Sequence, residues 1–387
     1  MTKHISFSSL AISGSLRLIY GEALPKTCFF SERTQFYSGV PKKRTQTNPN
    51  YAPKSNFLNS LQVNLSDHIR VNPGKISYEK QQMTGSNQRI AVLKGGPGSE
   101  REVSLASAAG VARALRELGA DVTEIDVTSP DFDLPQDTFI AFNLIHGTFG
   151  EDGELQKILE RKKVPYTGEG VEGSRLAFDK IESKRKFLEH NVPTAEFEVI
   201  TGGAKPSLPL PYVIKAPRQG SSVGVYIIKT ADQLEPALKD AAQYDDVLLV
   251  EKFVKGRELT VGILGNLALP IIEICPKQGF YDFKNKYPFL NAQGNSGAEH
   301  ICPAHLDEAQ TRLVQQSALK AVQALGLKVY SRVDVLLSDD GHASVLEINT
   351  IPGMTQASLL PEAAGVAGIS YGALCERIIE LSLARRK

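Results

Sequence analysis

Two short stretches near the carboxyl end of the chain, "SRVDVLL" and "SVLEIN", carry polar side chains at alternate positions. Alternate residues of a strand point to the same face, so Arg332 and Asp334 should share one face, as should Glu347 and Asn349. Carboxylate and amide oxygens suit Mg²⁺, which usually keeps water and phosphate oxygens as its other ligands. A neighbouring guanidinium can neutralise charge in a transition state. We expect a metal site here, the alternative being an ordinary strand surface that faces solvent.

The apolar residues between these polar positions should form the buried face of both strands. By the same alternation, Val333 and Val335 of the first strand point into the core. Leu346 and Ile348 of the second strand are expected to be buried for the same reason. Two neighbouring strands would then present their oxygen ligands together on the opposite face.

A second group of residues in "VIKAPRQGSSVGV" suits phosphate binding. Lys215 ends an apolar strand, and a loop rich in Gly and Ser follows. Backbone N–H groups of such a loop can cradle phosphates, and a lysine adds a point charge. The stretch is not a P-loop, because no Gly-Lys-Ser/Thr follows and the next element is a strand rather than a helix. A plain hairpin turn is an equally good interpretation of this loop taken alone.

A third stretch, "LIHGTFGEDGELQ", places His146 at the end of an apolar strand. A loop with Glu151 and Asp152 follows, and a helix should begin near Glu154. Ligands of open α/β sheets bind at the carboxyl ends of the strands. We therefore expect His146 to contact a ligand, although a single histidine is more often structural.

Two acids, Glu251 and Glu258, follow an apolar strand in "VLLVEKFVKGREL". Acids at such positions are usually solvated on the surface. They gain a functional meaning only if the fold places them in a nucleotide cleft, and the residues alone leave this open.

The loop "KGGPGSEREVS" lies between an apolar strand and a helix, a place where phosphates often bind. It carries Glu100 and Glu102, which a phosphate would not tolerate, and it lacks the GxGxxG pattern of dinucleotide-dependent oxidoreductases. A zwitterionic amino acid fits better. Its carboxylate suits the helix N-terminus, Glu100 can pair with its ammonium group, and the glycines allow a close backbone approach.

These residues require a scaffold of alternating strands and helices. Strands in "RIAVLKGG", "DVTEIDV" and "TFIAFNLI", with helices in "SEREVSLASAAGVARALRELG" and "GELQKILERKKV", predict an open parallel α/β unit. Ser99 is the expected N-cap of the first helix, and Gly119 its end. The helix "AFDKIESKRKFLEHNV" leads to the next unit.

The second unit should be mainly antiparallel, with strands in "PYVIKAP", "VGVYIIKT", "DVLLVEKFV" and "RELTVGIL" and a helix in "ADQLEPALKDAAQY". A third unit contains "ALPIIEIC", the helix "DEAQTRLVQQSALKAVQALG", the two polar strands and the final helix "SYGALCERIIELSLARR". The predicted domains are therefore 83–180, 181–258 and 259–387.

Composition and charge limit the classes of partner. The 387-residue chain has a formal net charge of +1, which hides +7 in residues 1–82 and −6 in the remainder. The mildly acidic remainder argues against nucleic acid. No apolar run approaches the roughly 18 residues of a membrane span. Four widely spaced cysteines, without a CxxC pair, predict free thiols in a reducing compartment.

Residues 1–82 are rich in Ser, Asn, Lys and Pro and should not bury a core, so we expect disorder. Three interpretations stay open. The segment is a basic, acid-poor transit peptide, a basic interaction tail, or an over-long start ahead of translation from Met83.

Taken together, "HGTFGEDGELQ", "KAPRQGSSVGV" and "SRVDVLL…LEINTIPGMTQASLLP" closely resemble the D-alanine–D-alanine ligase family. The resemblance covers about residues 88–384, in the same order, and not residues 1–82. It implies an α/β (α+β) chain with the three-domain ATP-grasp fold, an N-terminal open parallel α/β domain, and ATP held between the central and C-terminal sheets. It also implies phosphorylation of one D-alanine carboxylate by ATP and attack on the acyl phosphate by a second D-alanine, for peptidoglycan synthesis, cell wall biogenesis and cell shape.

The resemblance also assigns roles to residues of this chain. Arg332 and the backbone N–H of Gly353 would stabilise the tetrahedral intermediate. His146, Ser358 and Leu359 are the expected substrate contacts. The implied metal ligands, for two Mg²⁺ ions or Mn²⁺ in their place, are Asp334, Glu347 and Asn349. The implied ATP contacts are Lys180, Lys215, Glu251, Phe253 and Glu258.

A long loop, "KQGFYDFKNKYPFLNAQGNSGAEH", is of the kind that closes over a site to exclude water. Its Lys286 and Tyr287 match a lysine–tyrosine pair of the family. The resemblance implies that Ser221 and Glu100 hold the tyrosine hydroxyl, and that tyrosine goes with D-alanine as second substrate whereas phenylalanine goes with D-lactate. The chain departs from the family pattern in a longer segment after Tyr287 and in Lys157, where a small residue is usual.

We accordingly expect a cytoplasmic, homodimeric enzyme whose partners are ATP and D-alanine, with no nucleic acid and no membrane. Two alternatives remain. One is an ATP-grasp ligase for a different carboxylate and amine, and the other is a non-catalytic nucleotide-binding regulator on the same fold. The intact set of Asp334, Glu347 and Asn349 argues against the regulator.

Overall fold

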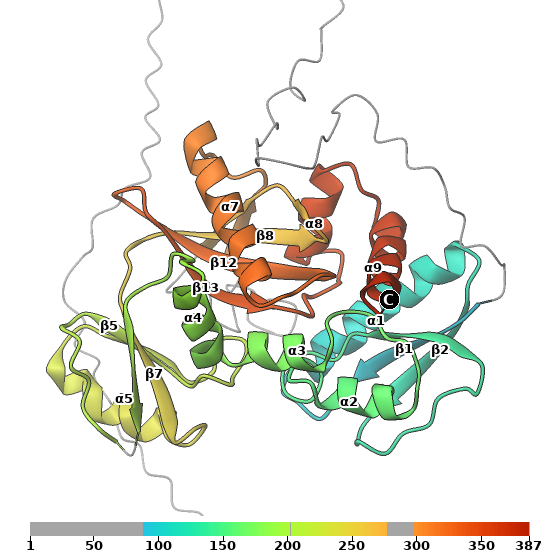
Figure 1. Cartoon of the computed structure of the whole chain (residues 1–387), viewed down its shortest axis with the longest axis horizontal. Helices are drawn as coiled ribbons and strands as arrows, with labels where there is room; N and C mark the ends of the chain where they lie inside the picture. The colour runs from blue at the N-terminus through green and yellow to red at the C-terminus, as the bar shows by residue number, and fades with distance from the viewer. Residues whose placement is uncertain (1–87, 202, 277–297, 387) are drawn as a thin grey trace, which may run out of the picture. The chain divides into compact units, whose positions relative to one another are not determined.

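Three β-sheets and their covering helices organise the residues that the computed structural model describes, namely 88–201, 203–276 and 298–386 (Figure 1). These residues belong to one compact unit. The predicted leader of residues 1–82 and the predicted lid residues Lys286 and Tyr287 lie outside the described residues.

The first sheet is a three-stranded parallel sheet in the order β2-β1-β3. Its elements are β1 (Arg89–Gly95), α1 (Arg101–Glu117), β2 (Asp121–Val127), β3 (Thr138–Asn143) and α2 (Glu154–Arg161). The central strand is buried along its length, as expected where helices cover both faces of a parallel sheet. The open parallel α/β unit is therefore confirmed.

Helix α1 begins differently from the prediction. Glu100 rather than Ser99 occupies the N-cap position, and its side chain makes no capping hydrogen bond. The Glu100 backbone carbonyl accepts from Ser104 N at 3.0 Å, so the first helical turn closes one residue later than expected. At the other end Gly119 takes φ +91°, a conformation that favours glycine, so the predicted helix end is confirmed.

The second sheet is antiparallel throughout, in the order β4-β7-β5-β6. Its elements are β4 (Phe197–Thr201), β5 (Tyr212–Lys215), β6 (Val225–Ile228), the short 3₁₀ helix η1 (Ala231–Gln233), α5 (Leu234–Ala241) and β7 (Val247–Lys252). The antiparallel character of the central unit is confirmed. Strand β4 was not anticipated from the sequence.

The third sheet has the strand order β11-β10-β8-β12-β13, with β9 paired to β8. Its strands are β8 (Gly256–Leu264), β9 (Leu267–Ala268), β10 (Ile272–Pro276), β11 (Ala298–Ile301), β12 (Tyr330–Ser338) and β13 (Ala343–Asn349). The prediction that "RELTVGIL" belongs to the central unit is wrong, because β8 pairs with β12 over its whole length. The predicted boundary at residue 258 falls inside β8, and the division into three domains stays a prediction.

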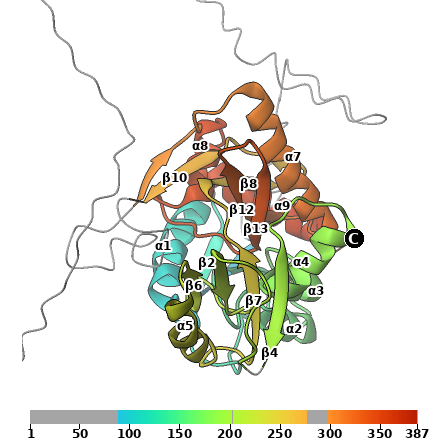
Figure 2. The same cartoon turned by 90° about the vertical axis from the view of Figure 1, so that its left-hand side faces the viewer.

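Helices cover both faces of the third sheet. They are α3 (Val171–Phe178), α4 (Lys180–Glu189), α7 (Glu308–Ala324), α8 (Leu359–Val366) and α9 (Tyr371–Arg385). Figure 2 shows α7 along the sheet, where Val314 and Ala318 share a core with Val333 and Val335. The other face joins α1, α8 and α9 in a second core. The prediction that Val333 and Val335 point inward is confirmed.

A β-bulge in β13 changes the alternation that the sequence predicts. Val333 pairs with Ile348 and Val335 pairs with Val345, so Leu346 is the extra residue between them. Val345 and Ile348 are buried, whereas Leu346 is only partly buried, so the expectation for Leu346 is wrong. The bulge lies beside the polar positions and leaves those after it on one face.

Two further expectations from the sequence concern the cysteines and the lack of a membrane-spanning helix. Cys275, Cys302 and Cys375, the cysteines of the described residues, are thiols outside any disulfide, as predicted. Among residues 88–201, 203–276 and 298–386, no helix is both long enough and apolar enough to cross a bilayer.

Candidate active site

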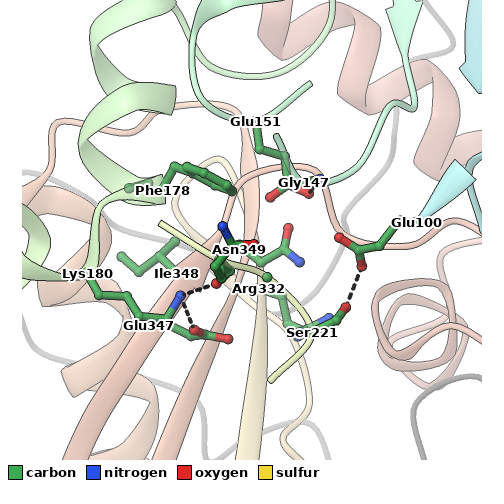
Figure 3. Close-up of a pocket in the computed structure, with 13 residues that line it drawn as sticks. Glu100, Gly147, Glu151, Phe178, Lys180, Ser221, Arg332, Glu347, Ile348 and Asn349 are labelled. Atoms are coloured by element: carbon green, nitrogen blue, oxygen red, sulfur yellow. Dashed lines mark hydrogen bonds and ion pairs between the residues drawn. The ribbon is translucent and has the colours of Figure 1, made fainter. Parts of the chain in front are cut away.

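A cavity gathers residues from the start of α1, the loop after β3, the junction of α3 and α4, the loop after β5, the start of β12 and the end of β13 (Figure 3). Its lining is Glu100, Gly147, Glu151, Ala177, Phe178, Lys180, Gln219, Gly220, Ser221, Arg332, Glu347, Ile348 and Asn349. Six of these residues were singled out from the sequence: Glu100, Lys180, Ser221, Arg332, Glu347 and Asn349. They come from positions up to 249 residues apart, and the fold brings them to one place.

The polar face of β12 and β13 is as predicted. Arg332 pairs with Asn349 across the strands, and Asp334 pairs with Glu347. The Arg332 guanidinium donates two hydrogen bonds of 2.9 Å to the Asp334 carboxylate. Thr260 of β8 donates a third to Asp334, at 2.7 Å. Asp334 is thus 5 % exposed and firmly held beside the cavity.

Lys180 connects this polar face to the Gly/Ser loop. It is the first residue of α4, whose N-cap Asp179 accepts hydrogen bonds from two backbone N–H groups. The Lys180 ammonium lies 3.0 Å from Glu347 Oε2 and donates to the Gln219 carbonyl at 2.8 Å. Figure 3 shows the lysine reaching across to Glu347. A cation therefore stands between the acidic strand and the loop proposed to hold phosphates.

The predicted metal ligands have the chemistry that Mg²⁺ requires, with two carboxylates and one amide on adjacent strands. Asn349 Oδ1 accepts from Ile351 N at 3.0 Å, which fixes the orientation of the amide. In the structure Arg332 and Lys180 balance the two carboxylates. Within the described part of the chain, no three His, Cys, Asp or Glu side chains group as in a protein-only metal cage. Such a donor set fits an ion that completes its shell with phosphate oxygens.

The Glu100 carboxylate lies at the opposite side of the cavity from Lys180 (Figure 3). Ser221 Oγ donates to Glu100 Oε1 at 2.5 Å. A Cβ placed on Gly147 or Gly220 would come within 2.9 Å and 3.1 Å of Glu100 Oε2, so larger residues would press on the carboxylate. Ser221 and Ser222 hold φ values of 52° and 61°, an unusual backbone for non-glycine residues that the surrounding structure must maintain.

The conformation of the loop after β3 is fixed by close backbone packing and by hydrogen bonds. A Cβ on Gly150 would lie 1.9 Å from the Ile145 carbonyl oxygen, which only glycine avoids. Asn143 Nδ2 donates to the Gly150 carbonyl at 3.0 Å. The Asp152 carboxylate accepts from Phe149 N at 2.7 Å and from Glu154 N at 3.0 Å, starting α2. The acids of "GEDG" thus have separate tasks, and Asp152 is structural.

Glu151 is a cavity residue that the sequence interpretation left unassigned. It is 7 % exposed and accepts from Gly147 N at 2.8 Å. Burial, reinforced by the charge of Glu100, raises the pKa of Glu151 to about 8. A signal was present in the sequence, since "GEDG" follows the carboxyl end of a buried strand, where ligands of open sheets bind.

His146 is buried beside the cavity but is not part of its lining. Its Nδ1 lies 2.8 Å from the Ile351 carbonyl oxygen and so carries the proton, and Nε2 lies 3.5 Å from Ser107 Oγ. Burial lowers the pKa of His146, although the Glu100 charge opposes this, so the ring is neutral at pH 7. In the structure His146 joins the loops that follow β3 and β13.

Glu251 and Lys215 meet in the second sheet, with a lysine that the sequence interpretation missed. Lys215 forms an ion pair with Glu251 Oε2, and Lys184 lies 2.5 Å from Glu251 Oε1. Burial would raise the pKa of Glu251, but the two ammonium groups outweigh it and lower the pKa to about 2. The only hint in the sequence was the position of Lys184, one helical turn after Lys180.

The remaining predicted residues lie outside the cavity lining. Phe253 and Glu258 are half-buried, and Phe253 N donates to the Pro211 carbonyl at 3.1 Å. Gly353 lies against Ser358, since a Cβ on the glycine would meet Ser358 Oγ at 2.8 Å. Leu359 is 6 % exposed and belongs to the core with α8 and α9. Of the residues predicted from the sequence, some therefore line the cavity, whereas these lie outside its lining.

Comparisons with known proteins give a consistent result. A family model described as the D-ala D-ala ligase C-terminus matches residues 182–380. A D-alanine–D-alanine ligase of Methylacidiphilum infernorum is 48 % identical over 300 residues, which are 78 % of this chain and 97 % of that protein. The ligase of Citrifermentans bemidjiense is 46 % identical over 300 residues, 76 % of this chain and 95 % of that protein.

Solved structures agree with this family. A crystal structure of a D-alanine–D-alanine ligase from Bacillus anthracis superposes with a TM-score of 0.69 and 32 % identity, covering 77 % of this chain and 98 % of that one. A structure of the Bacillus anthracis enzyme complexed with ATP gives a TM-score of 0.67 and 31 % identity, with the same coverage.

Proposed function

The chain belongs to the D-alanine–D-alanine ligase family, and we infer that it joins two molecules of D-alanine into D-alanyl-D-alanine at the expense of ATP. The reaction transfers a phosphoryl group to the carboxylate of the first D-alanine. The amine of the second D-alanine then attacks this acyl phosphate, releasing phosphate and the dipeptide for cell wall synthesis. The observation that carries the proposal is a single cavity bounded by Glu100, Lys180 and Glu347.

The first D-alanine is proposed to bind between the start of α1 and the loop after β3. Glu100 would pair with its ammonium group, because the carboxylate faces the cavity and is held by Ser221 at 2.5 Å. The N-terminus of α1 favours the substrate carboxylate nearby. A cavity lined by side chains of both signs of charge suits a zwitterion.

The phosphates of ATP are proposed to lie along the Gly/Ser loop. Lys180 holds the Gln219 carbonyl of this loop and faces Glu347, and Lys215 ends the strand that leads into it. One ammonium group at the start of this loop and one against its Gln219 carbonyl would supply charge to a polyphosphate. Adenine and ribose contacts by Glu251, Phe253 and Glu258 stay a proposal from the family resemblance.

Mg²⁺ is proposed to bind at Asp334, Glu347 and Asn349, whose oxygens suit it. When bound, the ion would neutralise phosphate charge during transfer. Arg332 would stabilise negative charge on the tetrahedral intermediate, because its guanidinium is fixed by two hydrogen bonds to Asp334 and lines the cavity. Gly353 is proposed to help through its backbone N–H, and Ser358 and Leu359 to place the carboxylate of the second D-alanine. His146, at the end of the strand that leads into the cavity loop, stays proposed as a substrate contact.

We further propose that the enzyme works as a homodimer in the cytoplasm. The reaction needs ATP, and the three free thiols of the described residues suit a reducing compartment. Light scattering after gel filtration tests the dimer. Lys286 and Tyr287 fall outside the described residues, so their proposed lid contacts are to be tested by substituting each of them.

The test of the function is purified protein with ATP, Mg²⁺ and D-alanine. We expect release of phosphate and a product with the mass of D-alanyl-D-alanine, and neither when D-alanine is omitted or replaced by L-alanine. Phosphate release only with a different amino acid would contradict D-alanine as the substrate, while the assignment as an ATP-dependent ligase would still stand. Binding of ATP without turnover of any amino acid would indicate a nucleotide-binding regulator.

A further inference from the structure

Lys184 is a completely buried lysine on α4 that the proposed reaction does not use directly. Its side chain has 0 % exposure. Its ammonium group lies 2.5 Å from Glu251 Oε1, donates to Thr194 Oγ1 at 2.5 Å, and stands 5.6 Å from the centre of the Phe197 ring. A buried ammonium group is costly unless it is paired and hydrogen-bonded, so these contacts satisfy it.

The contacts of Lys184 connect both sheets that flank the proposed nucleotide site. Glu251 belongs to β7 of the second sheet. Thr194 links Lys184 to the third sheet, because the Thr194 hydroxyl donates a hydrogen bond to the Val345 carbonyl of β13 at 2.8 Å. One ammonium group therefore fixes α4, β7 and β13 with respect to one another.

The charges of this cluster are unequal. One carboxylate, Glu251, lies between two ammonium groups, so the three side chains carry a net charge of +1. The side chain of Lys215 is 12 % exposed, whereas that of Lys184 is 0 % exposed. Lys184 is placed to neutralise Glu251, and Lys215 is the cation that a ligand can reach.

We propose that Lys184 is a positioning residue for ATP, which neutralises Glu251 so that Lys215 offers an uncancelled positive charge to the phosphates. The inference rests on the proposed function. Without Lys184, Glu251 and Lys215 would form a neutral pair, so the carboxylate that Lys215 already contacts would cancel the positive charge offered to the phosphates. Shortening the Lys184 side chain then lowers the affinity for ATP, although Lys184 itself contacts no substrate.

The test compares Lys184→Met in two backgrounds, with the ATP dissociation constant measured by calorimetry in the absence of D-alanine. In the wild-type background we expect affinity to fall by about 10- to 100-fold, because one net positive charge is removed from beside the bound polyphosphate, where the protein screens charge less than water does. In the Glu251→Gln background we expect a change within about twofold, because no carboxylate is left to neutralise and independent changes add. Lys186→Met is the matched control, since Lys186 lies on the same helix, is 40 % exposed and pairs with Glu189.

The outcomes separate the possibilities. Equal losses for Lys184→Met in both backgrounds would show a purely packing role and overturn the inference, as would an ATP affinity unchanged from wild type. Steady-state kinetics should show a raised KM for ATP with an unchanged KM for D-alanine. If Lys184→Met alone does not fold, the Glu251→Gln background still decides, because a loss of ATP affinity beyond twofold there would show that Lys184 acts other than by neutralising Glu251 and would overturn the inference. A wild-type protein that binds no ATP would overturn the proposed function itself.

Discussion

Two buried glutamates in different regions of this molecule have opposite acid strengths. Glu251, in the second sheet, is 2 % exposed, and Glu151, in the loop after the first sheet, is 7 % exposed. Burial raises the pKa of both, yet Glu251 lies between two lysines that lower its pKa to about 2. Glu151 has a backbone N–H and the charge of Glu100 near it, and its pKa rises to about 8. The partner, rather than the depth of burial, decides the charge of a buried acid.

This difference divides the site by function. Glu251 stays ionised at physiological pH, although burial lowers the pKa of its partner Lys184, and a permanently ionised acid suits a region proposed to hold the nucleotide. Glu151 is mostly protonated at pH 7 and titrates just above it, beside the proposed binding place of an amino acid. Replacement by glutamine imitates a protonated carboxyl group, so it should be damaging at ionised acids and mild at Glu151.

The largest effect should come from Glu347→Gln, at the carboxylate next to Lys180. We expect turnover to fall by about 10²- to 10³-fold or more, because a neutral amide neither pairs with Lys180 nor replaces a charged oxygen ligand. Phosphate release at saturating ATP and D-alanine measures it. Normal rates in a correctly folded variant would remove Glu347 from the proposed metal site.

Glu251→Gln should have the largest effect on stability. It leaves the buried Lys184 and the half-buried Lys215 without a counter-charge, and the free energy of unfolding at pH 7 should fall by about 3–5 kcal/mol. Urea titration followed by circular dichroism measures this. Since the pKa of Glu251 is depressed from 4.5 to about 2, its contribution exists above pH 4.5 and is lost as the pH falls through 2. A loss below 1 kcal/mol at pH 7 would contradict the charge assignment.

Glu100→Gln tests the other side of the comparison. Removing this charge should raise the KM for the first D-alanine by about 10- to 100-fold, as for a lost charge pair, and change the KM for ATP far less. It should also lower the pKa of Glu151, because the Glu100 charge is one cause of its elevation. Carboxyl titration by NMR detects that shift. Equal losses for D-alanine and ATP would argue against the amino-acid site.

Glu151→Gln should have the smallest effect of these variants at pH 5, and its effect should grow as the pH rises. The folded-state pKa of about 8 lies above the ordinary value of 4.5 for a glutamate, so the wild type loses stability as the pH rises from 4.5 to 8. The variant should lack this loss. We expect the two proteins to agree within about 1 kcal/mol at pH 5, and the variant to become relatively more stable up to pH 8. Parallel unfolding curves at pH 5 to 9 would contradict this.

Much of the site followed from local patterns in the sequence. The period of a strand is a property of the backbone, so the shared face of Arg332 and Asp334 and the inward Val333 needed no tertiary information. The same holds for the open parallel unit and for the end of α1 at Gly119. Local patterns failed at Leu346, where an extra residue in the strand changes the alternation. They also failed at Ser99, because the helix begins one residue later and Glu100 takes the N-cap position.

The sequence by itself determined the family, the kinds of chemistry available and the segments that carry them, because these depend on residue types and short spacings. Only the tertiary structure decided which charges meet. Glu100 and Ser221 are separated by 121 positions, and the pairing of Lys184 with Glu251 joins a helix to a distant strand. The strength of a buried acid depends on such partners, and no spacing along the chain specifies them. This is why Glu251 and Glu151, similar as letters in the sequence, became opposites in the fold.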